Sequence, residues 1–182
     1  MLLSPQRSTL LVVDVQQKLL PVIHEHEAVL AHCVWMIRAA HKLGVPVAAT
    51  VQNPRGLGAI AEAVGALIAD EAIANKNHFS CVAAGCLPGL PGADRAQVVL
   101  VGIESHVCVL QTAVELVEEG REVFVVADAV GSRRPSDRDL ALARMRQEGV
   151  RVVSREMVAF EWLKEAGTPL FKDVSKELLR GS

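Results

Sequence analysis

The apolar residues of this 182-residue chain fall into short uninterrupted blocks instead of alternating with polar residues. Five blocks are clear and a sixth is weaker: 10–13, 45–51, 98–103, 123–126 and 150–153, then 72–74. Such runs are typical of strands buried on both faces. Between them the apolar spacing is helical, three or four residues apart, as in Val107, Leu110, Val114 and Val117. Strands that alternate with helices require crossover connections and therefore a parallel sheet.

The same junction occurs three times, where a helical stretch meets a glycine and then an apolar block, at Gly44, Gly120 and Gly149. Glycine tolerates the left-handed conformation that ends many helices. We therefore predict an α/β fold: a single three-layer α/β/α domain over 1–182, with a parallel, Rossmann-like sheet of about six strands.

Two local patterns refine this prediction. The segment 136–139, Ser-Asp-Arg-Asp, resembles a capping box and predicts the start of the fifth helix. The tail 169–182 is amphipathic, with apolar residues spaced for a helix. We expect the tail to dock on the body or to lie at a subunit interface, and we expect a homo-oligomer, a dimer or higher.

Composition excludes several classes of function. Lys+Arg 19 against Asp+Glu 21 leaves no basic excess to hold a phosphate backbone, so we expect no nucleic-acid partner. No apolar run reaches the ~18 residues of a membrane span, so we expect no membrane contact and a cytoplasmic location. The four cysteines form no C-x-x-C pair, which argues against a zinc site and predicts free thiols.

Three residues whose side chains can take part in catalysis stand where apolar blocks end. Asp14 follows the first block, Lys76 follows the weak third one, and Cys108 lies where the fourth block turns into a helix. Ligands bind at the carboxyl ends of the strands in such sheets. A thiol there could act as a nucleophile, with the carboxylate as general base and the ammonium offsetting negative charge. A helix start and a nearby cation both lower a thiol pKa, so we expect Cys108 to be the most reactive of the four thiols.

Simpler explanations exist for each residue. Cys108 could be an ordinary core residue, Asp14 could cap the following segment, and Lys76 could lie on the surface. Their convergence at one sheet edge favours chemistry more than any one of them does.

Motifs across the chain resemble the isochorismatase-like cysteine hydrolase superfamily. The matching segments are 11–16 (Leu-Val-Val-Asp-Val-Gln), 75–80 (Asn-Lys-Asn-His-Phe-Ser), 101–109 (Val-Gly-Ile-Glu-Ser-His-Val-Cys-Val) and 127–130. The segment 156–161 also resembles the isochorismatase domain-containing branch.

The resemblance implies roles for particular residues. Asp14, Lys76 and Cys108 would form the catalytic triad. A cis peptide between Ile103 and Glu104 would shape an oxyanion hole together with Cys108. The implied reaction is hydrolysis of a carbon–nitrogen bond, other than a peptide bond, in a small amide-like substrate through a Cys108 thioester.

The chain differs from the nicotinamidases of this superfamily, and the difference bears on the metal and cofactor it would need. Nicotinamidases carry a metal-binding Asp-x-His cluster after the second strand, whereas 49–58 here contains neither residue, so we expect no metal and no cofactor. As weaker candidates for the substrate pocket we name Gln16, Gln52, Phe79 and His106. His106 is also the runner-up to Asp14 as the base.

Two rival functions are kept open. The segment 56–61 matches G-x-G-x-x-A, so the chain could be a Rossmann-like protein that binds a nucleotide or another small molecule. Alternatively, it could be a non-catalytic interaction module on a hydrolase fold.

Overall fold

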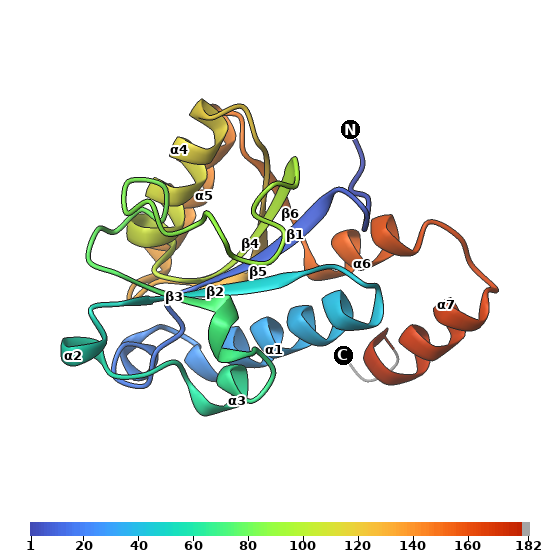
Figure 1. Cartoon of the computed structure of the whole chain (residues 1–182), viewed down its shortest axis with the longest axis horizontal. Helices are drawn as coiled ribbons and strands as arrows, with labels where there is room; N and C mark the ends of the chain where they lie inside the picture. The colour runs from blue at the N-terminus through green and yellow to red at the C-terminus, as the bar shows by residue number, and fades with distance from the viewer. Residues whose placement is uncertain (180–182) are drawn as a thin grey trace.

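The computed structural model describes residues 1–179 and contains a six-stranded parallel sheet (Figure 1). The strand order across the sheet is β3-β2-β1-β4-β5-β6, and every neighbouring pair is parallel. The strands are β1 (Ser8–Val13), β2 (Val47–Gln52), β3 (Ile73–Lys76), β4 (Gln97–Ile103), β5 (Glu122–Gly131) and β6 (Arg151–Val153).

Helices cover both faces of the sheet, which gives the three layers that the sequence predicts (Figure 1). The longer helices are α1 (His26–Lys42), α4 (Leu110–Glu118), α5 (Pro135–Gln147) and α6 (Arg155–Leu163). The shorter ones are α2 (Pro54–Leu57), α3 (Glu62–Gly65), α7 (Pro169–Val174), and the single turns η1 (Leu20–Val22), η2 (Asp70–Ala72), η3 (Ser105–Val109) and η4 (Ser175–Leu179). Helices α1 and α6 pack on one face, and α4 and α5 pack on the other.

The predicted fold class is confirmed, while several element boundaries differ. Strand β2 begins at Val47, after Pro46, whose nitrogen cannot donate to a neighbouring strand. Strand β3 is displaced toward Lys76 relative to the predicted 72–74. Strand β5 continues past 126 to Gly131, because an irregularity in its pairing with β4 lets it resume contact further along.

The predicted capping box at 136–139 is wrong. Helix α5 begins at Pro135, with Arg134 as its N-cap and no side-chain hydrogen bond at the cap. Proline has a fixed φ suited to the first helical position, and so the helix starts one residue earlier than Ser136.

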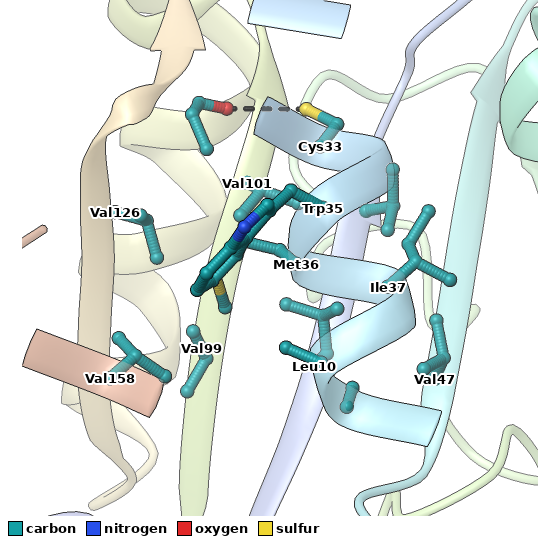
Figure 2. Packing of buried hydrophobic residues seen from close by; sticks show 14 of the residues in the cluster. Leu10, Cys33, Trp35, Met36, Ile37, Val47, Val99, Val101, Val126 and Val158 are labelled. Atoms are coloured by element: carbon teal, nitrogen blue, oxygen red, sulfur yellow. Dashed lines mark hydrogen bonds between the residues drawn. The ribbon is translucent and has the colours of Figure 1, made fainter. Parts of the chain in front are cut away.

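Side chains alternate between the two faces of the sheet along each strand. On β1, Leu10 and Val12 belong to the cluster under α1, whereas Leu11 and Val13 belong to the cluster under α4. Figure 2 shows Met36 of α1 among side chains of the sheet. Because both faces are covered, the middle of the sheet is almost entirely apolar.

The described part of the 169–182 tail docks on α1 of its own chain. The indole N–H of Trp35 donates to the carbonyl oxygen of Leu178 at 2.8 Å, and Val174 is fully buried. Two positions were predicted for the tail, and the structure shows residues 169–179 docked on the body of the same chain. Residues 180–182 lie outside the described residues. Over 1–179, no helix combines the length and the apolar character needed to span a bilayer.

Candidate active site

The sheet brings the three candidate residues to one edge. Asp14 follows β1, Lys76 is the last residue of β3, and Cys108 lies in η3 just after β4. Strands β1 and β4 are neighbours in the middle of the sheet. Strands β2 and β3 follow on the side of β1, and β5 and β6 follow on the side of β4. This reversal of strand order is the place where ligands bind in open parallel sheets.

Asp14 and Lys76 form a fully buried ion pair. The Lys76 Nζ atom lies 2.6 Å from Asp14 Oδ2, and both side chains have zero exposure. Asp14 has a φ of 51°, in the left-handed region, which aspartate tolerates better than most residues. A buried ion pair is a weak source of stability, because desolvation offsets the attraction between its charges.

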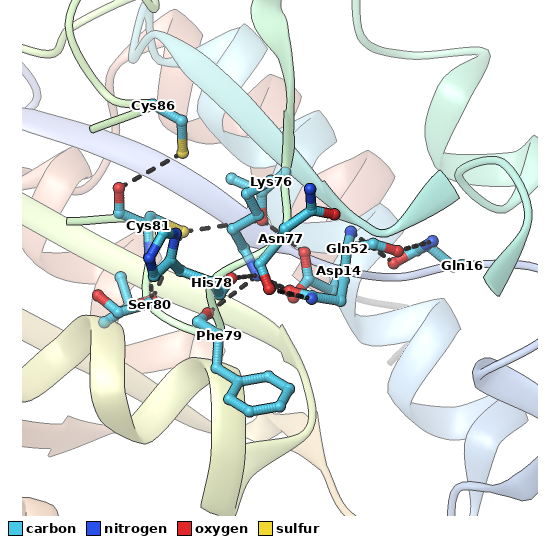
Figure 3. A network of polar contacts seen from close by, with 12 residues as sticks. Asp14, Gln16, Gln52, Lys76, Asn77, His78, Phe79, Ser80, Cys81 and Cys86 are labelled. Atoms are coloured by element: carbon cyan, nitrogen blue, oxygen red, sulfur yellow. Dashed lines mark hydrogen bonds and ion pairs between the residues drawn. The ribbon is translucent and has the colours of Figure 1, made fainter. Parts of the chain in front are cut away.

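The ammonium of Lys76 is held by further acceptors around it (Figure 3). It donates to Gln52 Oε1 at 2.8 Å, to the carbonyl of Phe79 at 2.9 Å and to that of His78 at 3.3 Å. The loop that follows β3 therefore folds back over the end of the lysine side chain. This arrangement fixes the position of the positive charge.

Thr50 completes the environment of Asp14 and is not among the residues predicted from the sequence. Its hydroxyl, fully buried on β2, donates to Asp14 Oδ1 at 2.8 Å. A signal was available, because Thr50 is a polar residue near the carboxyl end of an apolar block. The same criterion identified Asp14 and Lys76.

Cys108 is buried beside this ion pair. Burial, and after it the negative charge of Asp14, raise the pKa of its thiol to about 12, against the opposing effect of Lys76. Hydrogen bonds with Asp14 and with Lys76 also contribute to this pKa. The thiol is therefore protonated near neutral pH and lies next to a carboxylate that could accept its proton.

The pKa shifts of the thiols point away from Cys108 and toward Cys86. Cys86 is half-buried, and its pKa is lowered to about 7, chiefly by a hydrogen bond from Cys81. The prediction for Cys108 considered the helix start and Lys76, but not the cost of burying a charged sulfur.

The segment from the end of β4 to Cys108 begins with a close approach to β1 at Gly102. The bond between Ile103 and Glu104 is a cis peptide, at the position that the resemblance implies. Gly102 has a φ of 116°, and a Cβ atom there would lie 2.1 Å from the carbonyl oxygen of Val13. Only glycine fits at this crossing.

The chain that follows β5 supports the same segment. The carboxylate of Glu104 accepts from the Arg133 backbone N–H at 3.1 Å and from Arg133 Nε at 3.0 Å. His106 Nδ1 lies 3.0 Å from the hydroxyl of Ser132. His106 thus contacts the residue that follows β5 through this nitrogen.

Two of the weaker pocket candidates make their hydrogen bonds within the protein. Gln16 donates to the carbonyls of Gln52 and Gly58, and it accepts from the backbone N–H of Gln52. Gln52 donates to the carbonyl of Asn77 and accepts from Lys76. Both glutamines therefore join the loops around the site.

Phe79, the remaining weaker candidate, has a half-exposed side chain at 51%. A surface hollow of about 690 Å³ lies near it, at the end of β3. Phe79 is not in its lining, which comes from the start of α2, the end of β3 and the chain beside them: Asn53, Pro54, Arg55, Asn75, Lys76, Asn77, His78 and Ala84.

The glycine-rich segment 56–61 does not open a helix after a strand. Strand β2 is followed by the four-residue helix α2, and Gly58 ends that helix. The carbonyls of Leu57 and Ala59 accept from the backbone N–H groups of Lys18 and Gln17. The segment packs against the loop that follows β1 and lacks the strand-to-helix setting of a dinucleotide site.

No group of three or more His, Cys, Asp or Glu side chains within 1–179 is arranged to hold a metal ion. The segment after β2, where nicotinamidases carry such a cluster, supplies Asn53 and Pro54 here.

A parallel α/β sheet with helices on both faces is the fold of solved proteins of the isochorismatase family. The family model described as the isochorismatase domain matches residues 8–157 of this chain. Isochorismatase domain-containing protein 2 of Danio rerio is 37% identical over 99% of this chain and 91% of its own length. The chain belongs to the isochorismatase family.

Solved structures agree with this assignment. A structure described as the MAR1 ribonuclease of Caenorhabditis elegans has a TM-score of 0.88 and 34% identity, covering 100% of this chain and 94% of that one. The Escherichia coli YcaC gene product, described as an octameric hydrolase of unknown specificity, has a TM-score of 0.85 and 24% identity, covering 91% and 83%. At that identity the second likeness shows the fold alone.

Proposed function

We propose that this protein is a cysteine hydrolase that cleaves a carbon–nitrogen bond, other than a peptide bond, in a small amide-like substrate. The main support is the buried pair of Asp14 and Lys76, 2.6 Å apart, beside the Cys108 thiol. Burying an acid and a base in this way brings little stability, so the pair is better explained by a role in chemistry at the strand ends. The triad roles are a proposal that this geometry and the family support.

The first step forms a covalent intermediate. Asp14 takes the proton of the Cys108 thiol as the sulfur attacks the substrate carbonyl carbon, so no free thiolate need accumulate. The backbone N–H groups of Glu104 and Cys108 are the proposed donors to the oxyanion. The carbon–nitrogen bond then breaks, the nitrogen takes the proton from Asp14, and ammonia or an amine leaves.

The second step releases the product. Asp14 removes a proton from a water molecule, the oxygen attacks the thioester carbon, and the carbon–sulfur bond breaks. The proton then returns from Asp14 to the Cys108 sulfur. Throughout both steps the ammonium of Lys76 stays beside the carboxylate and offsets its charge.

A panel of small amides and ureas tests this proposal by ammonia release, with Cys108→Ser as the blank. We expect at least one compound to release ammonia with the native chain only, and to leave an acyl adduct on Cys108 in a rapidly quenched sample. A short RNA is added to the panel, because a relative is described as a ribonuclease. RNA cleavage that persists in Cys108→Ser, with no amide turned over, would overturn the proposal.

We also propose that the protein is a cytoplasmic homo-oligomer, in keeping with its free cysteines and with the octameric description of one structural neighbour. Static light scattering at low protein concentration tests the oligomer, and a monomer mass would contradict it. Cell fractionation tests the location.

A further inference from the structure

Two cysteines outside the proposed triad lie side by side in the loop that covers Lys76. The backbone N–H of Cys86 donates to the carbonyl of Cys81 at 3.3 Å, which closes one turn of chain between them. The Cys86 thiol donates to the same carbonyl at 3.4 Å (Figure 3). Inside this turn the backbone N–H of Gly85, whose φ is 60°, donates to the carbonyl of Val82 at 2.8 Å. These two hydrogen bonds are the pair that folds the chain back at the end of a helical turn, and they bring Cys86 next to Cys81.

The two thiols differ in accessibility and in acidity. Cys86 is half-buried, whereas Cys81 is fully buried. The pKa of Cys86 is lowered to about 7, because the Cys81 thiol donates to its thiolate and the charge of Lys76 is nearby. The pKa of Cys81 is raised, chiefly by that same hydrogen bond and by burial. Cys86 is thus the thiol that a small oxidant reaches in its reactive form.

We propose that Cys86 and Cys81 are an oxidation site at which a hydroperoxide forms an intrachain disulfide. The Cys86 thiolate attacks the outer oxygen of the hydroperoxide, the O–O bond breaks, and the alkoxide that leaves takes a proton from water. This oxidises the Cys86 sulfur to a sulfenic acid and reduces the hydroperoxide to an alcohol. The Cys81 sulfur then attacks the Cys86 sulfur, the S–O bond breaks, and the hydroxide leaves as water with the Cys81 proton.

The position of this pair links it to the candidate active site. The Cys81 sulfur lies 3.5 Å from the hydroxyl of Thr112 and 3.8 Å from that of Thr50, which holds Asp14. A bond to Cys86 draws this sulfur toward the surface loop. The proposal itself depends on the loop contacts and not on the hydrolase reaction.

Mass spectrometry of the whole chain treated with hydrogen peroxide tests the site directly. The tryptic peptide 77–95 contains Cys81 and Cys86 and no other cysteine. We expect this peptide to become about 2 Da lighter, to resist alkylation, and to recover both properties after reduction with dithiothreitol. The experiment is done on the Cys108→Ser background, so that oxidation of Cys108 does not interfere.

Variants separate the two steps. Cys81→Ser leaves no resolving thiol, so we expect Cys86 to accumulate as a sulfenic acid that dimedone traps. Cys86→Ser removes the accessible thiol, so we expect Cys81 to be oxidised at least about tenfold more slowly. Cys33→Ser, at a buried thiol that donates to the carbonyl of Ala129, is the matched control and should behave like the parent chain. A peptide 77–95 of unchanged mass, oxygen added to Cys86 with no bond to Cys81, or dimers on a non-reducing gel would each overturn the proposal.

Discussion

The middle of the sheet and its carboxyl edge are both buried, but different forces stabilise them. In the middle, apolar side chains from β1 and β4 pack against helices on both faces. At the edge, the same two strands lead into the buried Asp14 and Cys108, and each charged group there depends on a specific partner. Apolar burial gains stability in proportion to area, whereas a buried charge is tolerated only while its partners remain.

The largest loss of stability is expected when one charge is removed from the carboxyl edge. Lys76→Met leaves the Asp14 carboxylate buried without its cation, so we expect the free energy of unfolding to fall by about 3–5 kcal/mol. Urea denaturation at pH 7 measures this. Lys172→Met, at an exposed lysine of α7, is the control and should change little.

A double variant tests the reason for that loss. Asp14→Asn combined with Lys76→Met removes both charges, and should recover part of the stability lost in Lys76→Met alone. If the double variant is as unstable as the sum of the two single ones, the cost does not come from an unpaired carboxylate.

In the apolar middle of the molecule we expect the loss of stability to follow the volume of the side chain that is removed. Leu116→Ala deletes a fully buried side chain of α4 and leaves a cavity, at a cost of about 2–5 kcal/mol. The matched control is Leu140→Ala in α5, where the leucine is 70% exposed. Equal midpoints of thermal unfolding for the two variants would contradict the packing seen here.

A smaller effect distinguishes shape from hydrogen bonding at the edge. Thr50→Val keeps the shape of the side chain but removes the donor to Asp14 Oδ1, at a cost of about 1–3 kcal/mol. Thr50→Ser keeps the hydroxyl and should recover most of that loss. A valine variant as stable as the native chain would show that this hydrogen bond is dispensable.

The smallest expected effect concerns the docked tail. Trp35→Phe keeps an aromatic ring under the tail but loses the N–H donor to Leu178, at a cost of about 1 kcal/mol. Trypsin should then cut at Lys172 and Lys176 about fivefold faster, as that free energy implies. Trp162→Phe, whose indole donates to Ser8 away from the tail, should leave the cleavage rate unchanged.

Most of the architecture could be predicted because its signals are local. Apolar blocks and glycine junctions indicate buried parallel strands whatever their neighbours, and five of the six strands overlap the clear blocks. The boundaries were less predictable, because they depend on pairing between strands. The extension of β5 to Gly131 follows from its irregular register with β4, which no pattern within β5 reveals.

The candidate site was predictable in its members but not in its electrostatics. Asp14 follows β1 and Lys76 ends β3, and parallel strands bring their ends together. The raised pKa of Cys108 and the lowered pKa of Cys86 depend instead on burial and on contacts between distant loops. Residue type and spacing do not carry that information.

By itself, the sequence determined the α/β class and the family, and it predicted the edge of the sheet where the candidate residues meet. Tertiary structure alone decided that Thr50 supports Asp14, that Gln16 and Gln52 join loops, and that the tail lies on α1. The physical reason is range. Periodicity and turn residues act over a few positions, whereas the protonation and the hydrogen bonds of a buried group depend on whichever distant side chains the fold places within about 3–4 Å of it.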